Sequence, residues 1–324
     1  MHRMLTGERP TGPLHIGHLF GSVENRVRLQ REGVETLLVV ADYQVITDRD
    51  DTGDIAANVR EVVLDYLAAG IDPAAATIFT HSAVPALHQL MLPFLSLVSV
   101  AELDRNPTVK AERAASGRAM SGLLLTYPVH QAADILFCHA DVVPVGRDQQ
   151  PHLELTRTIA RRFNQRYGDT FVEPVGLLSD APVVLGTDGR KMSKSRGNGI
   201  ELRATADETV RLVRSARTDS DRHLTYDPVG RPEVANLLLL ASLCTGEGPE
   251  QIAERLDGSG ALKALVGDAL VAHLAPLRAR RRELAAEPGL VASLVAEGNA
   301  RANELADATL RDVRARMGMD YASI

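Results

Sequence analysis

Two short motifs, far apart in the chain, constrain the fold more than any other feature. The first motif is Gly12-Pro13-Leu14-His15-Ile16-Gly17-His18, which follows a short apolar run. The second motif is Gly189-Arg190-Lys191-Met192-Ser193-Lys194-Ser195. Between them, apolar runs typical of strands alternate with amphipathic runs typical of helices, which predicts an α/β domain.

The first motif has the properties of a phosphate site. His15 and His18 are three residues apart, so they share one face in the first turn of a helix. A helix N-terminus offers unpaired N–H groups and partial positive charge. Gly12 and Gly17 allow the backbone to bend and to approach a ligand closely. The plainer alternative is a solvated helix start.

The second motif places Lys191 and Lys194 in a segment rich in glycine and serine, which predicts a mobile loop. Ammonium groups on such a loop can close on a leaving pyrophosphate. An ordinary surface loop is the alternative for this motif taken alone. The two motifs in this order favour the phosphate interpretation of each.

The alternation of elements predicts a Rossmann-like, doubly wound parallel sheet. Ligands of such sheets bind at the carboxyl ends of the strands, where 6–12 and 146–149 lie. We expect strands at 3–7, 35–41, 77–80 and 142–145. Helices are expected at 17–32, 54–70, 84–100, from Thr126, and at 149–167, with no regular period in 104–121.

Beyond about Ile200 the patterns are helical throughout. We therefore expect a catalytic domain over residues 1–200 and an all-helical domain over 201–303. A last helix, about 304–324, is expected to pack back on the first domain. The run Arg278, Arg280, Arg281 and Arg282 is the densest basic stretch. It is either a solvated helix face or a contact for nucleic-acid phosphates.

Composition excludes several classes of protein. A net charge of −6 argues against a basic protein that coats nucleic acid, although a local basic face remains possible. Two isolated cysteines supply neither a zinc knuckle nor a disulfide framework, and they fit a reducing cytoplasm. No run of about eighteen apolar residues occurs, so no membrane span is expected. We predict no protein-held metal site.

Between the motifs lies a second set of candidate residues. Tyr127, Gln131 and Asp134 fall at i, i+4 and i+7 and share one face of a largely apolar helix. A carboxylate on such a helix needs a partner. Asp134 therefore faces solvent, pairs with an arginine, or accepts a hydrogen bond from a ligand.

Asp148 and Gln149 follow a strand and open a helix. Asp148 is either a helix N-cap or a ligand of a ribose hydroxyl. Gln149 is a candidate to hold a polar substrate group.

Several blocks resemble the bacterial tryptophanyl-tRNA synthetases, which are class I aminoacyl-tRNA synthetases. The resemblance covers the chain nearly end to end. Its blocks are Thr6-Gly7-Glu8-Arg9-Pro10-Thr11-Gly12, Tyr127-Pro128-Val129, Ala132-Ala133-Asp134-Ile135-Leu136, Pro144-Val145-Gly146 and His152-Leu153-Glu154-Leu155-Thr156-Arg157. The resemblance implies a cytoplasmic homodimer that activates L-tryptophan with ATP and Mg²⁺ and charges tRNA(Trp).

The resemblance also implies residue roles. Asp134 would accept the indole N–H, with Gln131 beside it, and Tyr127 and Gln149 would hold the polar end of the amino acid. The residues implied in ATP binding and activation are His15, Gly17, His18, Asp148, Lys191, Met192, Ser193, Lys194 and Ser195.

The chain departs from the family at Arg9, His18, Tyr43, Gln131 and Arg147. Gln131-Ala-Ala-Asp134 also matches the tyrosyl-tRNA synthetases, so a tyrosyl enzyme is one alternative. A divergent or auxiliary tryptophanyl paralogue is another. The helical region argues against a small-molecule nucleotidyltransferase, and the intact motifs argue against a paralogue without catalysis.

Overall fold

The computed structural model describes residues 2–47, 51–116, 119–146, 149–178 and 183–321. Within these residues the centre is a five-stranded parallel sheet in the order β3-β2-β1-β4-β5. The strands are β1 (Arg3–Glu8), β2 (Glu35–Val40), β3 (Ala76–Thr80), β4 (Val142–Val145) and β5 (Val175–Leu178). The predicted Rossmann-like sheet is confirmed. Strand order reverses between β1 and β4, so the loops after these strands diverge and leave room for a ligand.

One strand escaped the sequence analysis. β5 has four residues, includes Gly176 and follows Pro174. Val175 is 57% exposed, so the strand lacks the buried apolar run that identifies β2. Short edge strands carry a weak signal because one of their sides has no strand neighbour.

The helix after β1 and the helix before β3 form as expected. α1 (Ile16–His18), a π-helical turn (Leu19–Val23) and α2 (Glu24–Arg31) make one continuous helical run. α3 (Ile55–Ala69) begins where the Asp54 carboxylate accepts a hydrogen bond from the Ala57 N–H at 2.9 Å. It ends at Gly70, whose φ of 108° is a conformation that glycine adopts without strain.

Three predictions for the middle of the chain are wrong. The helix expected at 84–100 is two helices, α4 (Pro85–Leu95) and α5 (Val100–Arg105), because Ser99 and Glu102 form a capping box that starts a new helix. The irregular segment expected at 104–121 contains α6 (Pro107–Ser116).

The third wrong prediction is the start of the helix that bears Tyr127, Gln131 and Asp134. α7 (Gly122–Leu136) begins before Thr126, because the Ser121 hydroxyl accepts the Leu124 N–H at 3.0 Å. Thr126 is no cap: its hydroxyl donates to the Gly122 carbonyl at 2.7 Å. Pro128 therefore lies inside the helix. α8 (Gln150–Tyr167) follows β4 near the predicted place.

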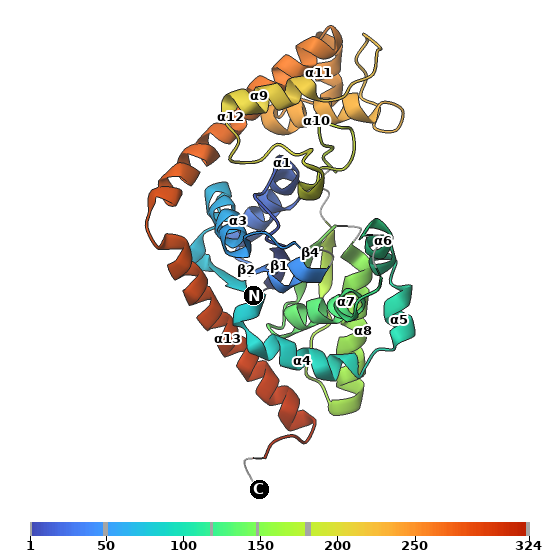
Figure 1. Ribbon diagram of the computed structural model, residues 1–324, viewed down its shortest axis with the longest axis vertical. Helices are drawn as coiled ribbons and strands as arrows, with labels where there is room; N and C mark the ends of the chain where they lie inside the picture. Colours follow the sequence, from blue (N-terminus) through green and yellow to red (C-terminus); the bar gives the residue numbers. More distant parts are fainter. Residues whose placement is uncertain (1, 48–50, 117–118, 147–148, 179–182, 322–324) are drawn as a thin grey trace.

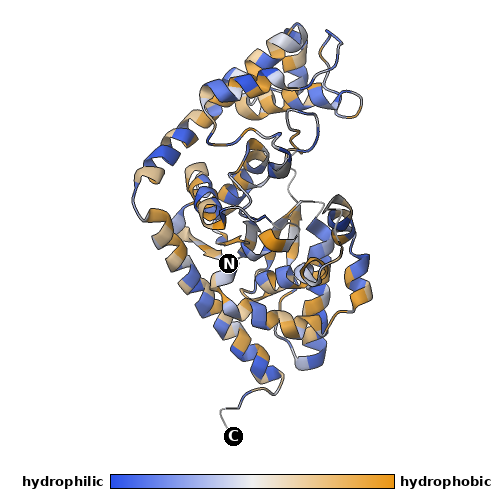
Figure 2. Ribbon diagram, viewed as in Figure 1, coloured by the Kyte–Doolittle hydropathy of each residue, from blue (hydrophilic) through white to orange (hydrophobic). Residues whose placement is uncertain are grey.

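The C-terminal region contains no strand among its described residues. It consists of α9 (Ala206–Ser215), α10 (Pro232–Thr245), α11 (Pro249–Arg255), α12 (Gly258–Ala286) and α13 (Leu290–Arg316). Figure 1 shows α9 to α12 gathered at one end and α12 and α13 running down one side of the molecule. Apolar and hydrophilic residues are interleaved along both long helices, as expected for helices that bury one face (Figure 2).

α13 packs directly on the edge strand β3. At Gly298 an added Cβ would lie 1.8 Å from the Ile78 carbonyl oxygen, so only glycine permits this approach. The Asn299 side chain accepts the Thr80 backbone N–H at 2.9 Å. The helix thus covers an edge that would otherwise expose unpaired backbone groups.

The apolar core continues from the sheet into the helical region. Leu14, Ile16 and Leu38 belong to the same buried cluster as Leu237 and Leu262. By length and composition, α12 is apolar enough to cross a membrane. Its residues Leu262, Leu270 and Leu274 are nevertheless fully buried in this cluster, so one face of α12 belongs to the core of the fold.

Three members of the arginine run make hydrogen bonds within the chain. Arg278 donates to the Leu202 carbonyl at 3.2 Å and to the Thr209 hydroxyl at 2.7 Å. Arg280 donates to the Leu67 carbonyl at 3.1 Å. Arg281 lies 2.6 Å from both Asp65 and Glu61 of α3. Arg280 and Arg281 thus hold α12 to α3 of the sheet domain, whereas Arg278 holds it to α9 and to the segment before α9. Arg280 and Arg282 are exposed, and their contact with nucleic-acid phosphates stays a prediction.

We predict that Arg281→Ala destabilises the protein by roughly 3 kcal/mol, because it leaves the buried Asp65 carboxylate without its charged partner. Urea unfolding followed by far-ultraviolet circular dichroism measures this. Arg282→Ala is the matched control on the next residue, and its effect should stay within about 0.5 kcal/mol. Equal losses from the two variants would contradict the role given to Arg281.

Candidate active site

The two motifs meet at the carboxyl end of β1. The Ile16 N–H donates to the Ile200 carbonyl and the Leu202 N–H to the Leu14 carbonyl, each at 2.9 Å. The segment after the second motif therefore pairs with the first motif. In addition, Lys194 Nζ donates to the Gly12 carbonyl at 2.8 Å. The structure thus joins the two motifs as the sequence required.

A buried asparagine shapes the second motif. The Asn198 side-chain oxygen accepts the Ser193 N–H at 2.9 Å, and its Nδ2 donates to the Asp188 carboxylate at 2.7 Å. Asn198 is thus the internal support of a turn that presents Lys191 and Lys194. Sequence reasoning missed it because a polar residue three positions after the motif looks like part of the loop.

His15 and His18 form a close pair whose protonation the structure defines. Their ring centroids are 3.8 Å apart. The His15 backbone N–H donates to His18 Nδ1 at 3.2 Å, so the hydrogen of a neutral His18 ring is on Nε2. Burial lowers the pKa of His15 to about 3 and the pKa of His18 to about 4. Both imidazoles are therefore neutral near pH 7, and each can donate a hydrogen bond to a ligand without adding charge.

An ionised carboxylate lies beside these histidines. Glu8, the last residue of β1, accepts a hydrogen bond from Arg26 at 2.9 Å. Burial by itself would raise the pKa of Glu8, but Arg26, His18 and Lys194 hold it below the usual value. Arg26 also donates to the Tyr66 hydroxyl at 3.0 Å. Glu8 and Arg26 thus form a buried ion pair with little net charge next to the first motif. The sequence analysis did not identify this pair.

A single cleft of about 550 Å³ collects most of the predicted residues. It lies over the carboxyl ends of β1 and β4, next to the point where strand order reverses. Arg9 lies on its rim, 3.9 Å from Glu112. The predicted site residues that line the cleft are His15, His18, Gln131, Asp134, Gln149, Lys191, Met192, Ser193 and Lys194.

Other predicted residues lie elsewhere. Gly17 packs under the His15 ring, and the buried Tyr127 hydroxyl pairs with His152 at 2.9 Å rather than lining the cleft. The Tyr43 ring is half exposed and contacts His88. Outside the described residues lie Arg147, Asp148 and the side chain of Ser195. The roles of these residues stay predictions.

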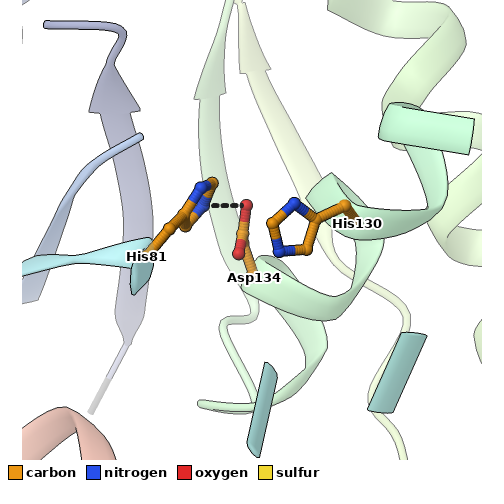
Figure 3. Close-up of side chains that lie close together, drawn as sticks. All are labelled: His81, His130 and Asp134. Atoms are coloured by element: carbon orange, nitrogen blue, oxygen red, sulfur yellow. Dashed lines mark hydrogen bonds and ion pairs between the residues drawn. The ribbon is translucent and has the colours of Figure 1, made fainter. Parts of the chain in front are cut away.

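At the far end of the cleft Asp134 is buried, with 2% of its surface exposed. Neither solvent nor an arginine stabilises it: Oδ2 lies 2.7 Å from His81 Nε2. The other oxygen, Oδ1, is buried and has no hydrogen-bond partner among the described residues. Figure 3 shows the Asp134 carboxylate between the rings of His81 and His130.

Fold and cleft together define a nucleotide-binding protein of Rossmann-like architecture. The family model for tRNA synthetases class I (W and Y) matches residues 1–275. The tryptophan–tRNA ligase of Lactococcus lactis is 42% identical over 336 residues, covering 98% of each chain. That of Treponema pallidum is 41% identical over 331 residues, covering 98% of this chain and 97% of the relative.

A solved structure agrees with these relatives. Tryptophanyl-tRNA synthetase from Campylobacter jejuni, complexed with ADP and tryptophan, superposes with a TM-score of 0.83 at 28% identity. The match covers 98% of this chain and 99% of that one. The chain belongs to the class I tRNA synthetases for tryptophan and tyrosine.

Gly17 offers a test of the histidine geometry. A Cβ at this position would lie 3.0 Å from the His15 ring, and Gly199 packs against the opposite edge of that ring, so the ring has little room to shift. We predict that Gly17→Ala lowers the rate of amino-acid activation roughly 10- to 100-fold, as expected for a displaced catalytic group.

Pyrophosphate exchange measures this effect. Gly21→Ala is the matched control, because apart from its chain neighbours and its own helix backbone no atom lies within 4 Å of the position its Cβ would take. It should keep the wild-type rate, and both variants should unfold near the wild-type temperature. A wild-type rate for Gly17→Ala would show that His15 tolerates displacement.

Proposed function

We propose that this chain activates L-tryptophan with ATP as tryptophanyl-adenylate and transfers the amino acid to tRNA(Trp). One observation carries the proposal: the histidines of the first motif, the lysines of the second motif and the buried Asp134 line one cleft. The sequence relatives are tryptophan–tRNA ligases over nearly the whole chain. This favours tryptophan over tyrosine, although Gln131 is compatible with both.

The phosphate end of the cleft suits adenylate formation. A carboxylate oxygen of the amino acid bonds to the α-phosphorus of ATP, and the bond from that phosphorus to the bridging oxygen breaks. Pyrophosphate leaves with the bonding electron pair, so no proton transfer is needed. The ammonium groups of Lys191 and Lys194 stabilise the charge that builds on the leaving group, and the neutral His15 and His18 rings donate hydrogen bonds.

Magnesium would enter this reaction bound to ATP. The carboxylates among the described lining residues are Glu8 and Asp134. Glu8 is bonded to Arg26, and Asp134 lies at the opposite end of the cleft. This donor set is not a cage for a hard cation, which needs several oxygen ligands. We assign the ribose to Asp148 and the polar end of the amino acid to Gln149 as predictions from the family resemblance.

The amino-acid end of the cleft suits an indole ring. Leu5, Val39, Val143 and Val145 contribute apolar side chains to the lining. Indole has one N–H donor and no acceptor, so it needs apolar walls and one buried acceptor. Asp134 Oδ1 is such an acceptor, because it is buried and has no other described partner.

The remaining parts of the proposal rest on the family. We assign residues 1–200 to catalysis and 201–303 to anticodon binding, with the last helix packed back on the catalytic domain. The active form would be a cytoplasmic homodimer. Because Arg278 and Arg281 are engaged within the chain, we assign the tRNA contact of the basic run to the exposed Arg280 and Arg282.

The decisive experiment is pyrophosphate exchange with tryptophan, tyrosine and phenylalanine in turn, followed by charging of tRNA(Trp). Exchange that depends on tryptophan supports the proposal. Exchange with tyrosine alone would identify a tyrosyl enzyme. The absence of exchange with every aromatic amino acid would leave a binding protein.

We predict that Lys194→Ala slows tryptophan activation about 100- to 1,000-fold with a smaller effect on tryptophan affinity, because the lysine acts on charge that exists only in the transition state. Single-turnover adenylate formation measures the rate. Lys263→Ala, on α12 away from the cleft, is the control and should not change it. Activation of tryptophan by Lys194→Ala at the wild-type rate would refute the role.

We predict that Asp134→Ala lowers kcat/KM for tryptophan by a factor that corresponds to at least about 2–3 kcal/mol of lost transition-state stabilisation. The variant should also prefer tryptophan over phenylalanine less strongly than the wild type does. Phenylalanine has no ring donor, so it loses nothing when the acceptor is removed. The chain has no tryptophan residue, so indole fluorescence reports ligand binding directly. If this variant bound tryptophan as tightly as the wild type, the indole would have to bind elsewhere in the cleft.

A further inference from the structure

The Asp134 carboxylate depends on a residue from a distant part of the chain. His81 begins a short 3-10 turn (His81–Ala83) directly after β3 and is fully buried. Its Nε2 lies 2.7 Å from Asp134 Oδ2, and this is the only hydrogen bond that the described residues give to the Asp134 side chain. A carboxylate oxygen accepts, so the hydrogen is on Nε2.

His81, His130 and Asp134 have the chemistry of a metal site, since their ligand atoms lie within 4.8 Å of one another. The geometry favours a hydrogen bond instead. Ligands of a tetrahedral zinc ion, each about 2.0–2.1 Å from the metal, would be roughly 3.3 Å apart. The 2.7 Å between His81 and Asp134 is shorter than this and normal for a charge-assisted hydrogen bond.

His130 is placed to support the pair without replacing His81. Its ring centroid lies 4.6 Å from that of His81 and tilts by 43°. Its own Nε2 pairs with His88 Nδ1 at 3.1 Å. Burial lowers the pKa of His130 to about 4, so this ring is neutral near pH 7. It fills space beside the carboxylate without adding a positive charge.

We propose that His81 is a positioning residue for the amino-acid substrate. Its Nε2–H fixes Asp134 Oδ2 and leaves Oδ1 as the one oxygen able to accept a ring N–H. This inference rests on the proposed function, because it concerns the same pocket. Without His81 the carboxylate loses its only described partner, can rotate about its side-chain bonds, and meets the substrate in several orientations.

The test compares variants at His81 with one at His130. His81→Leu keeps the volume and removes the donor, whereas His81→Gln keeps an N–H at a similar reach. We expect His81→Leu to raise the KM for tryptophan roughly 10- to 100-fold, the range for a lost hydrogen bond to a charged group. The KM for ATP should not change, and kcat should change less. His81→Gln should restore most of the affinity.

Two controls separate positioning from packing. His130→Asn alters an equally buried neighbour and should leave the KM for tryptophan within about threefold of wild type, since His130 makes no described bond to Asp134. In an Asp134→Ala background, His81→Leu should have little further effect, because its target is gone. If His81→Leu does not fold, His81→Asn takes its place and is compared with His81→Gln. The asparagine side chain is too short to reach the Asp134 carboxylate.

The inference is overturned if His81→Leu keeps the wild-type KM, or if His130→Asn raises the KM equally. One zinc ion per chain in the dialysed protein, lost in His81→Leu, would also overturn it by showing a metal centre. The proposed function fails separately, if the wild type shows no tryptophan-dependent exchange. If the wild type used tyrosine instead, the ratio of each variant's KM for tyrosine to that of the wild type would decide the role of His81.

Discussion

The buried carboxylate of Asp65 connects the parts of this molecule that must act together. Asp65 is fully buried on α3, where Oδ2 accepts the Leu14 N–H at 2.8 Å and Oδ1 accepts from Arg281 at 2.6 Å. Burial raises the pKa of Asp65, and Arg281 and the Leu14 N–H oppose that rise. One side chain therefore sets the position of the residue before His15 and ties it to α12. A buried pair of this kind adds little net stability but strongly penalises other arrangements.

This connection explains which parts of the fold were predictable. β2, α3 and the helix after the first motif were found because their signals are local: an apolar run, the Asp54 cap and the Gly70 stop. The internal contacts of Arg278 and Arg281 were not foreseen, because a run of like charge has the same pattern whether it faces solvent or packs within the chain. Only the path of the chain decides, and no local period encodes that path.

The candidate site divides in the same way. The two motifs were recognisable because their chemistry is written in consecutive residues, and their meeting at β1 follows from parallel sheet topology. His81 and Asn198 were not recognisable, because each acts through contacts that the fold alone creates. Asp134 shows the limit clearly. The helix pattern demanded a partner for the carboxylate, but the partner comes from the end of another strand, fifty-three positions earlier in the chain.

Some of the buried polar atoms without a described partner belong to residues that line the cleft. They include His15 Nδ1 at the phosphate end and Asp134 Oδ1 at the other. Each such atom costs about 1–3 kcal/mol, which few proteins tolerate without a functional return. The folded chain therefore carries destabilisation at both ends of one cavity, and hydrogen bonds from a ligand at those ends would relieve it. A ligand that lacks the matching donor leaves the penalty in place, so the same atoms that weaken the fold provide selectivity.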